Sequence, residues 1–262
     1  MTTIPKRTMT DIHMHLIPGV DDGAENMEMS LLMLLQAQEQ GIRKIITTPH
    51  SEAFRYSKEG GRIIFRRLAE AAAKIFPDMS LALGCEVYCE RAIMDQVLED
   101  LDSGRYPTMN GTRYVLMEFS QWIVPEDTIP CVAALVKGGY KPIIAHMERY
   151  CHLRENMELV DQFRELGALI QLNAYSLFDE MDDGIKNWAR RLVQERKADF
   201  LGTDAHRTYH RPPSAACGLN WLYENVEQDY ADAIAWGNAE SLLFPEKNKK
   251  ESDGNEPLFR TL

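Results

Sequence analysis

Short apolar runs of strand length alternate along this chain with stretches whose apolar residues recur at helical spacing. Seven runs predict strands: Met9–Leu16, Lys44–Pro49, Leu81–Tyr88, Tyr114–Phe119, Pro142–His146, Ala168–Asn173 and Asp199–Thr203. Helical spacing is clearest in the intervening stretches Met29–Gln40, Ile63–Ile75 and Asn187–Arg196. This alternation is typical of α/β folds in which parallel strands are joined by crossover helices.

The length of the chain and its polar end define the expected domain. At 262 residues the chain is close to the roughly 250 residues typical of a one-domain α/β barrel. No internal linker or sequence repeat divides it. The segment Glu246–Pro257 carries no apolar side chain, which is the composition of a flexible segment. We therefore expect one barrel domain over residues 1–245 and a polar tail over residues 246–262.

The net charge and the cysteines indicate which class of partner and which cellular compartment to expect. A formal net charge of −11 disfavours nucleic acid as a partner, because that binding depends on lysine and arginine contacts to phosphates. Apolar runs such as Leu31–Leu35 are far too short to insert across a membrane, and no signal peptide is recognisable. Five cysteines without regular spacing indicate reduced thiols, so we expect a cytoplasmic protein. The sequence Asn110-Gly111-Thr112 is then a turn before a strand rather than a glycosylation site.

Two clusters of metal-ligand residues lie near the opposite ends of the chain. His13 and His15 end the first predicted strand, and Asp204 and His206 follow the last. Residues two apart in a strand point to the same face, so each pair can reach a single ion. The fold must bring the two ends of the chain together if both pairs serve one site.

Further candidate ligands lie near the carboxyl ends of the intervening strands. They are His50, Glu86, Glu118 and His146, and five of the seven histidines in the chain thus fall at predicted strand ends. In a barrel of parallel strands these ends form one rim, where active sites are built. Imidazoles and carboxylates gathered there would hold divalent ions. Taken singly, a histidine pair or a loop histidine has an ordinary structural explanation, but a buried Glu118 needs a partner such as a cation.

Two further sequence patterns are similar to known phosphatase motifs but are weaker than the metal-ligand pattern. Cys85 and Arg91 have the Cys-x5-Arg spacing of cysteine-dependent tyrosine phosphatases, but no glycine lies between them, and Glu86 and Glu90 would repel a phosphate. We therefore expect Cys85 and Cys89 to be buried thiols. The pair Asp100 and Asp102 is similar to an aspartyl-phosphate motif, but it ends a helical pattern rather than a strand, so we discount it.

The segments that carry these residues resemble the polymerase and histidinol phosphatase (PHP) superfamily. The resemblance is closer to its branch of manganese-dependent protein-tyrosine phosphatases from bacterial capsule and exopolysaccharide loci. The similar segments follow one another over almost the whole chain: Asp11–His15, Val20–Gly23, Thr48–His50, Gly84–Glu86, Met117–Phe119, Ile144–Tyr150, Thr203–His206 and Arg211–Pro213. The resemblance implies an α/β fold, a distorted TIM-like (β/α)7 barrel with parallel strands and outer helices.

The resemblance also implies three divalent metal ions and a phosphate-binding pair. The implied ligands are His13, His15, Glu86 and Asp204 for the first ion, Glu86, Glu118 and His146 for the second, and Asp22, His50 and His206 for the third. Manganese is the implied metal, although iron and zinc accept the same nitrogen and oxygen ligands. Arg149 and Arg211 would hold the substrate phosphate, a role that suits guanidinium geometry. The alternative for either arginine is a surface salt bridge.

The implied activity is hydrolysis of phosphotyrosine in proteins. Clustered divalent ions lower the pKa of a bound water, and the resulting hydroxide would attack phosphorus in line. The implied partner is the tyrosine-rich tail of a bacterial tyrosine kinase that controls capsule or exopolysaccharide synthesis. Alternatives are a PHP phosphatase for histidinol phosphate, a PHP exonuclease and a non-catalytic barrel that binds the kinase. Asp21 is a weak candidate for a general acid, and a role in the turn before Gly23 is favoured.

Overall fold

Parallel strands form the centre of the protein in two sheets. The computed structural model describes residues 8–55 and 59–245. In this part of the chain, one sheet has the order β1 (Met9–Met14), β2 (Ile42–Thr47), β3 (Ser80–Leu83). The other has the order β4 (Glu86–Tyr88), β5 (Tyr114–Glu118), β6 (Lys141–Ile144), β7 (Leu169–Asn173), β8 (Phe200–Gly202). Every strand pair is parallel, which confirms the predicted fold class.

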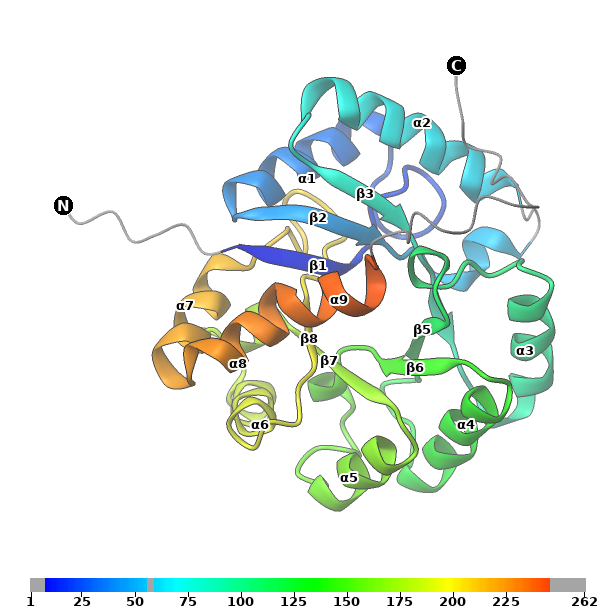
Figure 1. The fold of residues 1–262 in the computed structure, drawn as a ribbon, viewed down its shortest axis with the longest axis vertical. Coiled ribbons are helices and arrows are strands. Elements are labelled where there is room, and N and C mark those ends of the chain that lie inside the picture. The colour runs from blue at the N-terminus through cyan, green and yellow to red at the C-terminus, as the bar shows by residue number, and fades with distance from the viewer. Residues whose placement is uncertain (1–7, 56–58, 246–262) are drawn as a thin grey trace.

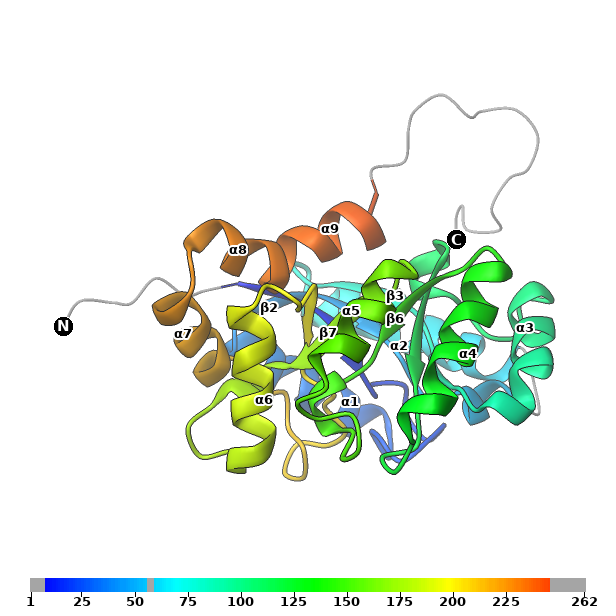
Figure 2. The same cartoon turned by 90° about the horizontal axis from the view of Figure 1, so that it is seen from below.

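Helices surround the strands and cover one end of the barrel. The outer helices are α1 (Met27–Glu39), α2 (Gly60–Ile75), α3 (Met94–Asp102), α4 (Pro125–Lys137), α5 (Met157–Glu165), α6 (Asp183–Gln194) and α7 (Ala216–Asn225) (Figure 1). The short helices α8 (Gln228–Asp232) and α9 (Asn238–Leu243) lie across one end (Figure 2). Ala239 and Leu243 of α9 pack on the inner apolar cluster, which includes Ile12, Leu116 and Phe200. The apolar cluster is thus buried at the end of the barrel that α9 covers, and the polar residues gather at the opposite end.

The first strand contains one extra residue that changes the direction of its side chains. Asp11 pairs with Ile45, whereas Met14 pairs with Thr47, so three steps on β1 match two on β2. The bulge is held by Asp11, whose Oδ1 accepts hydrogen bonds from the backbone N–H groups of His13 (3.1 Å) and Thr203 (3.0 Å). Because a bulge re-aims side chains, it turns His13 toward the barrel interior.

The predicted strand Leu81–Tyr88 is two strands in different sheets. β3 ends at Leu83 and pairs with β2, whereas β4 begins at Glu86 and pairs with β5. A Cβ atom on the intervening Gly84 would lie 2.9 Å from Ile46 Cγ2, so the chain bends here where only glycine fits. The strand count therefore differs from the seven predicted because one apolar run crosses both sheets.

Short contacts close the barrel on both sides of the smaller sheet. Asp204 N–H donates to the carbonyl oxygen of His13 (2.7 Å), and His15 N–H donates to that of Ala205 (2.9 Å). On the other side, Glu86 N–H donates to the carbonyl oxygen of Pro49 (3.0 Å). These bonds lie near the carboxyl ends of β1, β2 and β8 and join the segments that carry the candidate ligands.

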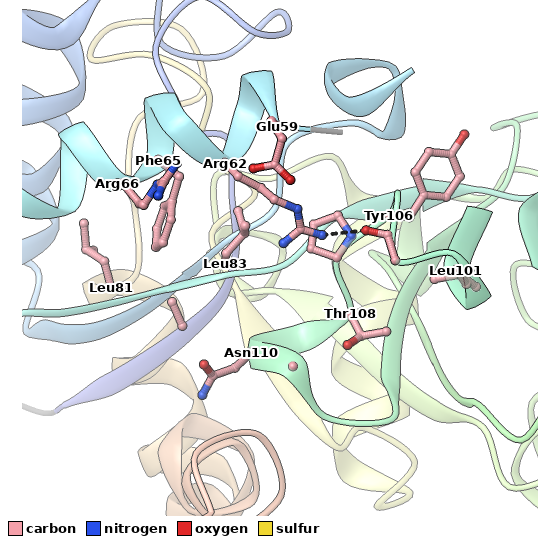
Figure 3. Close-up of a pocket in the computed structure, with 14 residues that line it drawn as sticks. Glu59, Arg62, Phe65, Arg66, Leu81, Leu83, Leu101, Tyr106, Thr108 and Asn110 are labelled. Atoms are coloured by element: carbon pink, nitrogen blue, oxygen red, sulfur yellow. Dashed lines mark hydrogen bonds between the residues drawn. The ribbon is translucent and has the colours of Figure 1, made fainter. Parts of the chain in front are cut away.

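A cavity of about 760 Å³ lies beside α2, away from the candidate ligands. Figure 3 shows it between Phe65 of α2, Leu81 of β3 and Leu101 of α3, with Arg62 donating a hydrogen bond to the Gly104 carbonyl oxygen (2.8 Å). Its walls contain none of the predicted site residues. This cavity is therefore not where the polar chemistry gathers.

Several other expectations concern segments at the edges of this fold. Asn110 and Gly111 adopt left-handed backbone angles directly before β5, which confirms the predicted turn. Among the helices of residues 8–55 and 59–245, none is long and apolar enough to cross a membrane. The proposed tail over residues 246–262 lies outside the described residues, so the division of the chain at residue 245 stays a prediction.

Candidate metal centre

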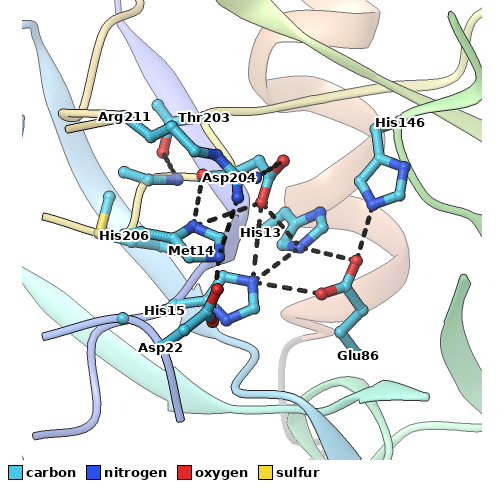
Figure 4. A network of polar contacts seen from close by, with 12 residues as sticks. His13, Met14, His15, Asp22, Glu86, His146, Thr203, Asp204, His206 and Arg211 are labelled. Carbon is cyan, nitrogen blue, oxygen red and sulfur yellow. Dashed lines mark hydrogen bonds and ion pairs between the residues drawn. The ribbon is translucent and has the colours of Figure 1, made fainter. Parts of the chain in front are cut away.

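All nine predicted metal ligands lie together at the rim formed by the carboxyl ends of the strands, although Glu86 is the first residue of β4 rather than near its carboxyl end. Figure 4 shows the central members of the group, which come from both sheets. They lie in or directly after β1 (His13, His15), after β2 (His50), in β4 (Glu86), at the end of β5 (Glu118), after β6 (His146) and after β8 (Asp204, His206), with Asp22 in the loop before α1. The two ends of the chain therefore meet at one site, as the paired clusters predicted.

The first group of ligand atoms surrounds the buried carboxylates of Glu86 and Asp204. His13 Nε2 lies 3.2 Å from Glu86 Oε1, and His15 Nε2 lies 3.2 Å from Glu86 Oε2. Asp204 Oδ1 lies 3.5 Å and 3.6 Å from the same two nitrogens. This oxygen is buried and has no hydrogen-bond partner among the described residues. A buried, unpaired carboxylate oxygen facing two imidazoles fits a cation-binding site.

The other two groups share His50. Its Nδ1 lies 3.1 Å from both Glu86 Oε2 and Glu118 Oε1, and its Nε2 lies 3.4 Å from Asp22 Oδ1. His146 Nε2 lies 2.8 Å from Glu86 Oε1 and 3.9 Å from Glu118 Oε2. Glu86 therefore lies between two of the predicted groups, as a bridging carboxylate would.

The remaining group brings Asp22 and His206 beside the ring of His15. His206 Nε2 lies 3.3 Å from Asp22 Oδ1, and the His206 ring stacks on His15 with centroids 3.8 Å apart. One ligand atom from each of His15, Asp22, His50 and His206 falls within 4.8 Å of the others. The predicted set of Asp22, His50 and His206 is thus together, with His15 as an additional neighbour.

Three of the histidines are fixed by acceptors on their outer ring nitrogens. Nδ1 of His13 donates to Gln171 Oε1 (3.1 Å), Nδ1 of His15 to Asp21 Oδ2 (2.8 Å), and Nδ1 of His206 to the carbonyl oxygen of Asp204 (2.9 Å). This protonation leaves a lone pair on each Nε2, which faces the carboxylates. Metal-ligating histidines are oriented in this way, so the residues present fit a metal site.

Asp21 orients His15 rather than serving as an acid. Its Oδ1 accepts the Gly23 N–H (3.0 Å), while its Oδ2 accepts the His50 N–H (3.0 Å) as well as the His15 ring N–H. Burial alone would raise the pKa of Asp21, but His15 and these donors lower it to about 2. A Cβ on Gly23 would lie 2.3 Å from the His15 carbonyl oxygen, so only glycine allows this turn. The favoured turn role is present, together with a contact that the sequence analysis missed.

We expect Asp21→Asn to weaken metal binding about 10–100-fold, because an amide is a poorer acceptor for the His15 ring N–H than a carboxylate. Metal titration followed by calorimetry measures the loss. Asp182→Asn is the matched control, since Asp182 also accepts backbone N–H bonds in a turn, from Gly184 and Ile185, but contacts no histidine. Equal affinities of the two variants would show that Asp21 serves only the turn.

Charge pairing holds the carboxylates of the centre in their ionised form. Burial acts to raise the pKa of Glu86, but His13, His146 and His15 hold it well below its usual range. Burial opposes protonation of His15, yet Asp21 and Glu86 raise its pKa to about 10. The centre is therefore built around buried anions that require positive charge, which divalent ions supply in place of imidazole protons.

Arg149 and Arg211 converge on the outer oxygen of Asp204. Arg149 Nη1 donates to Asp204 Oδ2 (2.6 Å), and Arg211 Nη2 contacts the same oxygen. Asp204 is buried, whereas the two arginine side chains are 26% and 32% exposed. Neither pair is the surface salt bridge considered as the alternative. The guanidinium groups lie at the boundary between the buried centre and the opening.

Strained backbone coincides with the centre. His146, Asp204 and Arg211 are three of the six non-glycine residues with positive φ in the described part of the chain. Such conformations cost about 1–3 kcal/mol each and persist where the surroundings enforce them, often at functional sites. Their position supports a functional role for this end of the barrel.

Supporting residues in β7 complete the polar network and were not predicted. Gln171 Oε1 accepts both the His13 ring N–H and the His146 backbone N–H (2.8 Å). Gln171 Nε2 donates to Asn173 Oδ1 (3.0 Å), and Asn173 Nδ2 donates to Asp204 Oδ2 (3.1 Å). Two polar side chains at i and i+2 in an apolar strand are the signal that could have identified them.

The alternative phosphatase patterns do not form sites. Cys85 is buried, and burial with the neighbouring Glu86 raises the pKa of its thiol well above the usual value, so it lacks thiolate character. Asp100 lies in α3 and pairs with Arg105, while Asp102 accepts the hydroxyl of Tyr140 (2.7 Å). Both patterns are therefore structural, as expected.

Comparison with known proteins gives one consistent family. The family described as "Capsular polysaccharide synthesis, CpsB/CapC" matches residues 9–244. The chain is 34% identical over 203 residues to the tyrosine-protein phosphatase YwqE of Bacillus subtilis, covering 78% of this chain and 79% of that protein. It is 29% identical over 243 residues to the tyrosine-protein phosphatase CpsB of Streptococcus agalactiae serotype III, covering 90% and 98%.

A solved structure agrees with this relationship over most of both chains. It comes from work on YwqE of Bacillus subtilis and CpsB of Streptococcus pneumoniae, described as unique metal-dependent tyrosine phosphatases. The two folds superpose with a TM-score of 0.80 at 31% identity, over 90% of this chain and 94% of the other. With the family match spanning nearly all described residues, this chain belongs to the CpsB/CapC family of capsular polysaccharide synthesis.

Proposed function

We propose that this protein is a metal-dependent tyrosine-protein phosphatase that acts in capsular polysaccharide synthesis. Its relatives YwqE and CpsB are named as tyrosine-protein phosphatases. One observation in the structure supports the proposal above all others. Three imidazoles whose Nδ1 atoms are hydrogen-bonded to acceptors present Nε2 to carboxylates, those of Glu86 and Asp204 buried and that of Asp22 exposed. That arrangement binds divalent metals, and no cysteine nucleophile is available beside it.

The proposed centre holds three divalent ions. The proposed ligands are His13, His15, Glu86 and Asp204 for one, Glu86, Glu118 and His146 for another, and Asp22, His50 and His206 for the third. The distances support this assignment, with His50 close enough to Glu118 to contribute to the second group instead. Manganese is proposed, and iron or zinc would suit the same nitrogen and oxygen donors.

The side chains around the centre define what the protein contributes to the reaction. When bound, the metal ions supply Lewis acidity, which lowers the pKa of water and polarises phosphoryl oxygens. In this proposal Arg149 and Arg211 bind the phosphoryl oxygens, and the meeting of their partly exposed guanidinium groups at Asp204 supports this role. Gln171 and Asn173 hold His13 and Asp204 in place. A tyrosine phenolate, with a pKa near 10, leaves without the strong acid that an alkoxide needs, which agrees with an ionised Asp21.

The proposed substrate is the tyrosine-rich tail of a bacterial tyrosine kinase that controls capsule or exopolysaccharide synthesis. The family name supports a role in this process, and tyrosine-protein phosphatase relatives support a phosphotyrosine protein as the substrate class. A cytoplasmic location belongs to the same proposal.

One experiment tests the activity against its rivals. Metal-stripped protein reloaded with manganese is assayed in parallel on a phosphotyrosine peptide, histidinol phosphate and single-stranded DNA. We expect rapid hydrolysis of the peptide, restored by metal and abolished by chelation. Hydrolysis of histidinol phosphate without hydrolysis of the peptide would refute the proposal, and degradation of DNA would favour the exonuclease. Turnover of none of the three in metal-loaded protein would indicate a non-catalytic barrel.

A further inference from the structure

A second hollow, of about 750 Å³, opens beside the Glu118 edge of the centre. Tyr88 of β4, the residues after it and the segment after β5 line it, and we call it the Trp122 groove after its exposed tryptophan. The groove is lined by Tyr88, Glu90, Arg91, Trp122, Val124 and Asp127. Tyr88 pairs with Glu118 across β4 and β5, and Cys89 N–H donates to the Glu118 carbonyl oxygen (2.8 Å). Paired residues on neighbouring strands share a face, so the groove begins where the candidate metal centre ends.

Trp122 is held in an exposed position by a fixed loop. Its side chain is 68% exposed, whereas its neighbour Ile123 is 8% exposed and packs in the core. The loop is anchored where Cys151 N–H donates to the Gln121 carbonyl oxygen (3.1 Å) and Phe119 N–H donates to the Tyr150 hydroxyl (3.0 Å). A large aromatic side chain on a rigid loop loses little entropy on binding, and tryptophan is enriched at the energetic centres of protein contacts.

The groove carries acidic groups that lack ionic partners. Glu90 and Asp127 line it, and neither forms an ion pair within the described part of the chain. Glu90 accepts a 3.5 Å hydrogen bond from the Tyr88 hydroxyl, which leaves its charge uncompensated. One cation, Arg91, also lines the groove, so the balance is negative. A basic side chain could stack on Trp122 and pair with these carboxylates.

We propose that the Trp122 groove binds the residues that flank phosphotyrosine in the substrate and selects an arginine or lysine there. The inference rests on the proposed function, since it concerns the polypeptide whose phosphotyrosine enters the metal centre. Because the groove adjoins Glu118, it lies where residues next to the phosphotyrosine would pass. The negative charges of Glu90 and Asp127 account for the preference for a basic residue. The groove thereby distinguishes a protein substrate from a small phosphate ester, which does not reach it.

The test compares substrates on the metal-loaded full chain. The substrates are p-nitrophenyl phosphate and a set of phosphotyrosine peptides that carry arginine, alanine or glutamate at each of three positions on either side. At one or more positions, we expect kcat/KM to be about tenfold higher with arginine than with glutamate. Trp122→Ala should lower kcat/KM for the best arginine peptide about tenfold relative to p-nitrophenyl phosphate, through KM. The double variant Glu90→Gln/Asp127→Asn should remove the preference for arginine.

Ile75→Ala is the control, because Ile75 is also a strongly exposed apolar residue but ends α2, away from the rim. It should leave the ratio of peptide to p-nitrophenyl phosphate activity unchanged. A wild-type protein without preference, or a Trp122→Ala variant with an unchanged ratio, would overturn the inference while leaving the phosphatase assignment intact. A change of oligomeric state in Trp122→Ala with unchanged peptide selectivity would identify a second copy as the occupant and also overturn it. If the metal-loaded wild-type protein hydrolysed no phosphotyrosine peptide at all, that result would instead refute the proposed function.

Discussion

His13→Ala is expected to lower kcat/KM by more than about a hundredfold, because residues that merely orient a metal ligand are already worth about 10–100-fold. His13 Nε2 faces both Glu86 and Asp204, at 3.2 Å and 3.5 Å, and its Nδ1 is held by Gln171. Alanine removes the nitrogen between these two carboxylates. Steady-state kinetics on a phosphotyrosine peptide and metal analysis after dialysis measure the two losses, with thermal unfolding as the check on folding.

Cys85→Ser is the contrasting variant for the same assay. Cys85 lies next to Glu86 in sequence but is a buried thiol with a raised pKa, so serine should preserve most of the activity. Loss of turnover in folded Cys85→Ser would restore the cysteine-dependent mechanism. Full activity and full metal content in His13→Ala would remove His13 from the ligand set.

The strands could be predicted because they are buried on both faces. β5, β6 and β7 are mostly apolar, and each begins and ends within two residues of its predicted limits. Their order in one barrel then placed the carboxyl ends, and the candidate ligands, on one rim. The convergence of His13, His50 and His146 follows from topology more than from any local motif.

Features that depend on distant partners could not be read from the sequence. The bulge that aims His13 is held by Asp11, whose carboxylate is bonded to Thr203, 192 residues away. The break at Gly84 lies inside one apolar run, and only the packing against β2 shows why glycine is needed there. Gln171 and Asn173, in contrast, have the same i, i+2 spacing as His13 and His15, so the reasoning that found the histidines applies to them too.

Arg149→Ala and Arg211→Ala should each lower kcat/KM about 10²–10³-fold, the usual effect of removing a donor that stabilises developing charge. Both guanidinium groups already contact Asp204 Oδ2, so a phosphate dianion at this boundary would meet two donors. Arginine-to-lysine variants should lie between wild type and alanine, because lysine keeps the charge but loses the planar fork. The same variants should bind inorganic phosphate more weakly as a competitive inhibitor, while retaining metal.

Arg164→Ala separates phosphate binding from the general loss of an ion pair. Arg164 is 32% exposed, as Arg211 is, and it pairs with the largely buried Asp199 (2.5 Å) before β8, at the opposite end of the strand from Asp204. Its removal should lower the free energy of unfolding and leave both kcat/KM and the inhibition constant of phosphate near the wild-type values. If Arg149→Ala and Arg211→Ala changed only stability, as Arg164→Ala should, their contacts with Asp204 would be structural ion pairs. A loss confined to activity and phosphate affinity, with stability unchanged, would assign them to the substrate.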